Sequence, residues 1–231
     1  MQKRMVRKLD LERAISKMAP HPAPKAYLEQ YTIPPEVASE ILYMATYVYG
    51  DIIDKRVADL GCGTGRLGIG AALLGAREVI GVDIDKVAIK TAQMNAEKMD
   101  VENKTHWVIA DINAIRGSFD TVLQNPPFGV QRRRADRRFI EKSLEIGRRI
   151  YSLHKSEISS RELVRRLKNR GAPIPTAPSP FLKKFIEKHG GTILAVYAMV
   201  MTIPKIFKFH TKRKYEFIVK LYILESSEAR T

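Results

Sequence analysis

Short apolar runs alternate with amphipathic segments through the middle of the chain. We expect strands at 56–60, 78–82, 106–110 and 119–123, because each is a compact apolar run that ends at a polar residue or a turn. Helical patterns follow the first two runs, one to about Leu74 and one over 86–99. Such an alternation predicts βαβ units, and therefore an α/β fold with a mostly parallel sheet.

Two helical patterns precede these units, and a fifth strand follows them. Apolar residues recur at helical spacing over 6–18. Pro34-Pro35 opens a second helix to about Tyr49, because the first turn of a helix does not need the amide that proline lacks. The fifth strand is expected at 149–153.

The C-terminal third has a different pattern. Helices are expected over 160–169 and 181–189, on either side of the proline-rich loop 172–180. Two long β-rich runs follow, 192–203 and 215–224, which can pair antiparallel at a sheet edge.

One domain is the simplest organisation for these elements. We predict a single domain over 1–231, in which 1–50 is an N-terminal helical extension and 157–190 is a helical insertion with the proline-rich loop.

A glycine loop occupies the first turn from strand to helix. Asp59-Leu-Gly-Cys-Gly-Thr-Gly65 allows a tight turn and a close backbone approach to a ligand. Asp83 ends the next strand, where a carboxylate can bind ribose hydroxyls, and Asp111 ends the third strand at the same sheet edge. Because Gly63-Thr-Gly-Arg-Leu-Gly68 also fits the dinucleotide pattern, the loop alone leaves open an NAD-type cofactor, another nucleotide cofactor and a purely structural turn.

The loop after the fourth strand, Asn125-Pro-Pro-Phe128, narrows this choice. Its prolines make the backbone rigid and remove two donors, which leaves the Asn125 side-chain oxygen and the Pro126 carbonyl as acceptors beside an aromatic ring. This set suits an exocyclic amine on a planar base, which can stack on Phe128. A turn that only ends the strand is the alternative.

Charge adds a class of partner. The chain has 40 Lys+Arg and 25 Asp+Glu, a formal net charge of +15, which favours polyanions, although a solvated basic surface is equally compatible. The single cysteine, Cys62, excludes an intrachain disulfide and a multi-cysteine zinc site, and no metal is expected. The longest apolar run is too short to span a bilayer and the basic N-terminus lacks a signal-peptide core, so we expect a cytoplasmic protein.

Two basic clusters are candidates for contact with RNA. One directly follows the Asn-Pro-Pro-Phe loop and the other joins the last two strands; their residues are Arg132, Arg133, Arg134, Lys208, His210 and Lys212. Charge runs are usually solvated surfaces, but the position of the first cluster beside the candidate base site favours RNA. His154 either faces that site or is a hydrogen-bonded structural histidine.

These motifs, in this order, resemble a class I N6-adenine methyltransferase. Further segments resemble the methyltransferase-like-5 group, which methylates one adenine in small-subunit ribosomal RNA: Leu28-Glu-Gln-Tyr31, Tyr151-Ser-Leu-His-Lys-Ser156 and Lys208-Phe-His210. The resemblance extends from about Tyr27 to Leu224. It implies a Rossmann-like, seven-stranded, mostly parallel sheet with an antiparallel last strand and helices on both faces.

The resemblance also implies S-adenosylmethionine as the cofactor and a set of site residues. It assigns cofactor contacts to Gln30, Thr32, Gly61, Gly63, Thr64, Arg66, Asp83, Asp111 and Asn125. Asp83 would bind the ribose, Asp111 would bind the cofactor's adenine amine, and Gln30 and the extension 1–50 would help to close the site. Asn125, Pro126 and Phe128 would hold the target adenine. The chain departs from the eukaryotic members at Thr32-Ile33, where they carry Pro-Thr, and in the longer segment 157–187.

A partner and two alternatives complete the expectation. The family implies a small zinc-ribbon activator that forms a heterodimer by pairing a strand at a sheet edge, either near 78–82 or at 106–110. Glutamine-N5 methylation of a protein uses a similar Asn-Pro-Pro-aromatic loop, but the charge of +15 and the absence of an extra N-terminal helical domain disfavour it. A non-catalytic RNA-binding module is the other alternative. DNA adenine methylation is disfavoured because no sizeable target-recognition domain is present.

Overall fold

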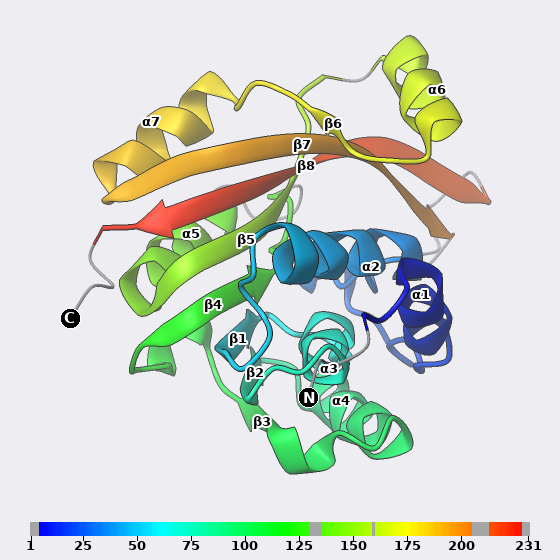
Figure 1. Cartoon of the computed structure of the whole chain (residues 1–231), viewed down its shortest axis with the longest axis vertical. Coiled ribbons are helices and arrows are strands. Elements are labelled where there is room, and N and C mark those ends of the chain that lie inside the picture. Colours follow the sequence, from blue (N-terminus) through cyan, green and yellow to red (C-terminus); the bar gives the residue numbers. More distant parts are fainter. Residues whose placement is uncertain (1–4, 130–134, 159, 205–212, 228–231) are drawn as a thin grey trace.

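The apolar runs form strands close to their predicted positions. The computed structural model describes residues 5–129, 135–158, 160–204 and 213–227. The first five strands are β1 (Arg56–Leu60), β2 (Glu78–Asp83), β3 (Thr105–Ile109), β4 (Phe119–Gln124) and β5 (Gly147–Lys155). They pair in parallel in the order β3-β2-β1-β4-β5, which confirms the α/β fold with a mostly parallel sheet (Figure 1).

The last strands extend this sheet in the antiparallel sense, as predicted. β7 (Gly191–Pro204) and β8 (Lys214–Ser226) pair along their whole length, and β8 lies between β7 and β5. The expected count of seven strands is wrong, because β6 (Ile174–Pro175) adds an eighth strand inside the predicted proline-rich loop. Proline is tolerated there because β6 is an edge strand, where a missing amide leaves no ladder bond unmade.

Most helices also follow the prediction. They are α1 (Lys8–Ser16), α2 (Pro35–Tyr43), α3 (Arg66–Leu73), α4 (Lys86–Lys98), α6 (Arg161–Arg170) and α7 (Pro180–Lys188). The helix α2 continues as a π-helical turn, η2 (Met44–Val48), and short 3₁₀ turns occur at η1 (Ala26–Leu28), η3 (Glu102–Lys104) and η4 (Ile112–Ala114). The pattern of the sequence did not predict α5 (Ala135–Ile146).

Two apolar clusters hold these layers together. Figure 1 shows α1, α2 and α3 on one face of the sheet and α5 and α7 on the other. Buried side chains of the first three helices belong to one cluster, and those of α5 and α7 belong to the other. A smaller cluster joins α6 to the outer strands through Leu167, Ala198 and Ile218. Within the described part of the chain, no helix is long and apolar enough to cross a membrane.

The topology brings the candidate residues to one edge of the sheet. Since β1 to β5 are parallel, the loops that follow β1, β2, β3 and β4 all leave from the same edge. The glycine loop, Asp83, Asp111 and Asn125 are in these four loops or at their starts.

Candidate active site

A cavity of about 660 Å³ opens at this edge, within the range of ligand pockets. All nine residues that the resemblance assigns to the cofactor line it: Gln30, Thr32, Gly61, Gly63, Thr64, Arg66, Asp83, Asp111 and Asn125. They come from four loops and the N-terminal segment, so the fold gathers residues that are widely separated in the sequence.

The glycine loop forms one wall. Gly61, Gly63 and Gly65 have φ values of 64°, 55° and 83°, in the left-handed region that favours glycine. A Cβ on Gly63 would meet no atom within 4 Å, so the backbone at this position is open to a ligand. A Cβ on Gly65 would instead lie 2.7 Å from the Trp107 ring, which requires glycine for packing.

Two buried carboxyls lie against this loop. Asp83 accepts hydrogen bonds from the Gly63 amide at 2.9 Å and the Asp85 amide at 2.8 Å, and burial raises its pKa above the usual value. One oxygen of Asp59 accepts from the Gly68 amide at 2.8 Å, and burial raises the pKa of Asp59 to about 7. The other oxygen, Asp59 Oδ1, is buried without a hydrogen-bond partner among the described residues. Asp59 is a site residue that the sequence analysis missed, although it belongs to the glycine motif.

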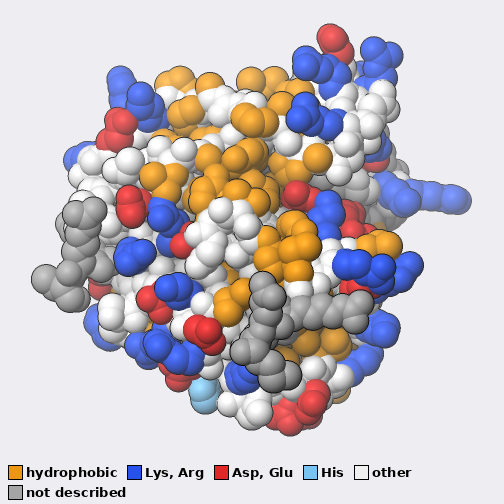
Figure 2. Space-filling view, viewed as in Figure 1, with side chains coloured by type: hydrophobic (Ala, Val, Ile, Leu, Met, Phe, Trp, Pro, Cys, Tyr) orange, Lys and Arg blue, Asp and Glu red, His pale blue; other side chains and the backbone are white. Residues whose placement is uncertain are grey.

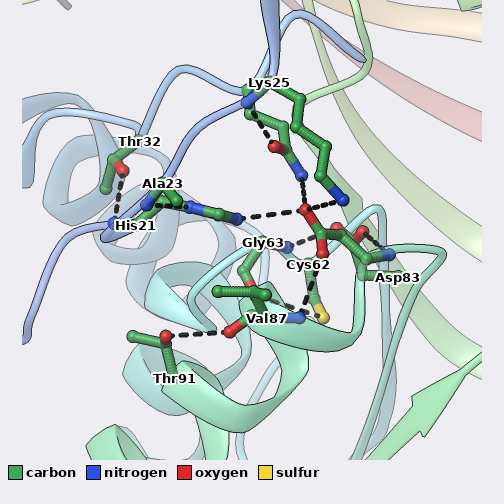
Figure 3. Close-up of polar contacts among 11 residues, drawn as sticks. His21, Ala23, Lys25, Thr32, Cys62, Gly63, Asp83, Val87 and Thr91 are labelled. Atoms are coloured by element: carbon green, nitrogen blue, oxygen red, sulfur yellow. Dashed lines mark hydrogen bonds and ion pairs between the residues drawn. The ribbon is translucent and has the colours of Figure 1, made fainter.

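The N-terminal segment is tied to the cavity by Asp85 (Figure 3). The buried oxygen Asp85 Oδ2 contacts His21 Nε2 at 3.3 Å, Lys25 Nζ at 3.2 Å and Gln30 Nε2 at 2.9 Å. Burial alone would raise the pKa of Asp85, but the hydrogen bonds from Gln30, the Val87 amide and Lys25 lower it to about 2. The carboxylate is therefore ionised at neutral pH and holds three side chains from the segment that covers the site.

Arg66 and Asn95 also hydrogen-bond to the backbone of the N-terminal segment. The buried guanidinium of Arg66 donates to the carbonyls of Ile33 at 2.6 Å and Met18 at 3.4 Å, and burial lowers its pKa. The Asn95 side chain bonds the backbone of Ala19 and the Thr64 carbonyl. Arg66 thus lines the cavity while its charged end is committed to the N-terminal segment.

Asn125 presents an acceptor at the far side of the cavity. Asn125 Oδ1 is buried and has no hydrogen-bond partner among the described residues, a state that costs about 1–3 kcal/mol for a buried polar atom. Pro127 also lines the cavity, whereas Pro126 and Phe128 do not. The Phe128 ring packs edge-on against Phe217 of β8, with the ring centroids 5.7 Å apart.

A buried polar chain supports the strand that carries Asn125. Gln124 Nε2 donates to Ser152 Oγ at 2.8 Å, and Ser152 Oγ lies 2.7 Å from His154 Nε2. On its other side, His154 Nδ1 lies 3.7 Å from Asp136 of α5. Of the two interpretations of His154, the structure supports the buried, hydrogen-bonded one, since this side chain is 4% exposed and is absent from the cavity lining.

At the end formed by the loop after β3, Asp111 already has a cationic neighbour. Arg138 Nη2 of α5 lies 3.1 Å from both carboxyl oxygens of Asp111, and both side chains are about half exposed. A ligand amine at Asp111 would share the carboxylate with Arg138.

The six residues proposed for RNA contact, Arg132, Arg133, Arg134, Lys208, His210 and Lys212, lie outside the described residues.

The cavity suits a nucleotide-type ligand that carries amines. The orphaned oxygens of Asp59 and Asn125 can each accept a hydrogen bond, and the space above Gly63 admits a close ligand. Together with the strand order, these features place the chain in the class of Rossmann-like methyltransferases.

Comparison with known proteins specifies the family. The model of the methyltransferase small domain matches residues 36–167. The rRNA N(6)-adenosine-methyltransferase METTL5 of Danio rerio is 37% identical over 166 residues, which cover 69% of this chain and 79% of that protein. The rRNA N(6)-adenosine-methyltransferase metl-5 of Caenorhabditis elegans is 33% identical, with 86% and 88% covered. The chain therefore belongs to the methyltransferase small domain family, in the group that includes these rRNA N(6)-adenosine-methyltransferases.

Solved structures agree with this assignment. A candidate RNA methyltransferase of Pyrococcus horikoshii superimposes with a TM-score of 0.79 at 38% identity, covering 96% of this chain and 98% of that one. A Thermoplasma acidophilum protein superimposes with a TM-score of 0.67 at 26% identity, covering 96% of this chain and 99% of that one. At 18% identity, the magnesium protoporphyrin IX methyltransferase of Synechocystis, solved with bound S-adenosylmethionine, shares the fold with a TM-score of 0.57.

Proposed function

We propose that the chain transfers a methyl group from S-adenosylmethionine to the N6 amine of an adenine in RNA, with small-subunit ribosomal RNA as the substrate. The observation that carries the proposal is the orphaned oxygen of Asn125 at the wall of a cavity built around the glycine loop. The family relatives named as rRNA N(6)-adenosine-methyltransferases support the same reaction. Appearance of N6-methyladenosine in ribosomal RNA tests it.

The chain's own residues orient the amine. The Asn125 side-chain oxygen and the Pro126 carbonyl would accept its two N–H hydrogens, which draws the nitrogen lone pair out of conjugation with the ring. When bound, S-adenosylmethionine supplies an electrophilic methyl group on a positively charged sulfonium. Because N6 is too weak an acid for a side-chain base to deprotonate first, its proton would leave after methyl transfer. The target adenine must be unpaired or flipped, since N6 is inaccessible inside a duplex.

We assign the cofactor to the loop and its acids. Gly61, Gly63 and Thr64 would hold its methionine end, Asp83 its ribose and Asp111 its adenine amine. Asp59 Oδ1, which is buried and unpartnered in the described structure, offers one more acceptor near the glycine loop.

We infer that the N-terminal extension closes the site within a single domain over 1–231. The contacts of Asp85 with His21, Lys25 and Gln30, and those of Arg66 with Met18 and Ile33, support this inference. The extension would then shield the reacting groups from water.

We also propose that the first basic cluster binds RNA beside the target base. Replacing Arg132, Arg133 and Arg134 by alanine should weaken RNA binding. The slope of the logarithm of the binding constant against the logarithm of the salt concentration should become shallower by about 1 for each lost phosphate contact. Filter binding or anisotropy at several salt concentrations measures both. An unchanged salt slope would mean that these arginines are only solvated.

A zinc-ribbon partner would bind at β3. Of the two candidate strands, β2 is internal, paired on both sides by β1 and β3, whereas β3 is the outermost strand and has exposed Val108 and Ile109. An internal strand has no free edge for an added strand, which supports β3 over β2 as the site that we propose.

Proline at Ile109 tests this edge. The Ala110 amide bonds inward to Asp83, so by alternation the Ile109 amide points away from β2 and is available to an added strand. Ile109→Pro should abolish co-purification with a zinc-ribbon partner and leave cofactor binding by the isolated chain intact, whereas Val108→Ala should retain the partner. Normal association of Ile109→Pro would exclude strand addition at β3.

The alternative reactions have less support. Ribosomal protein L11 methyltransferase of Thermotoga maritima is 43% identical, but only over 72 residues, which cover 31% of this chain. Neither that short match nor the geometry favours a protein amide or a non-catalytic module over an RNA base. We also propose that the protein acts in the cytoplasm, where ribosomal RNA would be available to it.

A further inference from the structure

The helix α6 stands on a part of the sheet that projects beyond the active-site edge. β5 and β8 pair only as far as Lys155↔Val219, whereas β7 and β8 stay paired to Pro204↔Lys214. The two outer strands therefore extend past the carboxyl end of β5, on the same side as the loop that carries Asn125. Leu167 packs α6 against this projection.

The amphipathic pattern of α6 separates its packing face from a cationic face. Leu163, Val164 and Leu167 pack towards the sheet. Five exposed cations occupy the rest of the helix: Arg161, Arg165, Arg166, Lys168 and Arg170. Figure 2 shows Lys and Arg side chains gathered where Figure 1 places α6. The helix contains a single acid, Glu162.

These charges are poorly neutralised within the protein. Lys168 pairs with Glu216, but no ion pair of the four arginines occurs among the described residues. Arg161 and Arg165, like Arg166 and Arg170, are four residues apart, a spacing at which like charges destabilise a helix. The helix is held instead by its packing and its caps, with Ser160 Oγ accepting from the Leu163 amide at 3.2 Å and Gly171 at φ 63°. A bound polyanion would relieve the repulsion.

We propose that the exposed face of α6 binds the phosphate backbone of the substrate RNA next to the target adenine. The proposal rests on the proposed function and assigns a role to the insertion 157–190. Arginine forks suit phosphate oxygens, and four of the five cations are arginines. Exposed Lys155, Arg213 and Lys214, at the same end of the sheet, continue the positive surface towards the loop that carries Asn125.

A pair of charge-removing variants tests the proposal. Arg165→Gln/Arg166→Gln removes two exposed cations from α6 and keeps side chains that favour a helix. Arg77→Gln/Arg148→Gln removes the same charge from exposed positions at the amino-terminal ends of β2 and β5, at the opposite edge of the sheet. Affinity for a long structured RNA with an unpaired adenine is measured over a range of salt, and methyl transfer is measured to that RNA and to a short unpaired oligonucleotide.

The α6 variant should bind the long RNA on the order of tenfold more weakly than the control variant, with a salt slope smaller by about 1 to 2. Its transfer to the short oligonucleotide and its cofactor affinity should match those of the wild type, which also establishes that it folds.

Equal affinities and slopes for the two variants, with a wild type that methylates RNA, would overturn the proposal and leave the proposed function standing. A wild type that transfers no methyl group to either RNA with the zinc-ribbon partner present would overturn both. Loss of binding to intact ribosomal subunits but not to naked RNA would assign α6 to a ribosomal protein and would also overturn it.

Discussion

Replacing Asn125 by alanine should lower the kcat for methyl transfer by at least about 10²- to 10³-fold, the cost of removing one preorganised hydrogen-bonding group from a reacting centre. The side-chain oxygen has no hydrogen-bond partner among the described residues, so its loss breaks no internal bond of that oxygen and removes its contact with the substrate. Affinity for S-adenosylmethionine should stay near that of the wild type. Single-turnover rates with saturating RNA, measured beside cofactor titrations, separate the two effects.

Two further variants make this result specific. Asn125→Asp keeps an acceptor oxygen and should retain more activity than Asn125→Ala, although it adds a charge. Asn103→Ala, at an exposed position before β3, should behave as the wild type. Parallel losses of cofactor affinity and kcat in Asn125→Ala would place Asn125 in the cofactor site and not at the target base.

The Asp83→Ala substitution should have the second large effect, a rise in the dissociation constant of S-adenosylmethionine of about 10- to 150-fold. This corresponds to the loss of hydrogen bonds to a charged group, about 1.5–3 kcal/mol. The same change also frees the Gly63 and Asp85 amides, so the glycine loop should become less ordered. Trp107, the chain's one tryptophan, packs under Gly65, and its fluorescence should report binding.

Asp83→Asn refines the interpretation, because it keeps the shape and the acceptor oxygen but removes the charge. Its affinity should lie between those of the wild type and Asp83→Ala. Glu97→Ala, an exposed acid on α4, should bind as the wild type. Unaltered cofactor affinity in Asp83→Ala would exclude the assignment to the ribose.

The pattern of the sequence predicted the parts of the fold that depend on local periodicity. The strands β1 to β4 lie within one residue of their expected ends, because each is a compact run of β-favouring residues closed by a polar residue or a turn; β1, β2 and β4 are largely buried, whereas β3 is mostly exposed. Once the strands are parallel, the convergence of Asp83, Asp111 and Asn125 follows from the topology.

Features that depend on tertiary contacts were not predicted. No element is predicted from the sequence over 135–146, where α5 forms, although Phe139, Ile140 and Leu144 pack on the sheet as one face of a helix. The two-residue strand β6 exists only because β7 offers an open edge. The apolar residues of α5 do recur at helical spacing, so the helix was recognisable from the sequence and was missed, whereas a two-residue strand is too short to leave a periodic signal.

The site shows the same limit. The glycine motif, Asp83 and Asn125 could be identified from residue types and spacing. The three contacts of Asp85 with the N-terminal segment join residues 55 to 64 positions apart, and no local sequence pattern predicts such contacts. Likewise, the packing of Phe128 against Phe217 joins the loop after β4 to β8, which is distant in the sequence. Stacking of the target base on Phe128 stays a prediction.

The most direct measurement is the transfer of labelled methyl groups from S-adenosylmethionine to purified small-subunit ribosomal RNA, with and without the zinc-ribbon partner that we propose, followed by digestion to nucleosides. We predict label in N6-methyladenosine with the wild type and its loss with Asn125→Ala. Label on a protein and not on RNA, or cofactor binding by the wild type with no transfer to any RNA, would contradict the account.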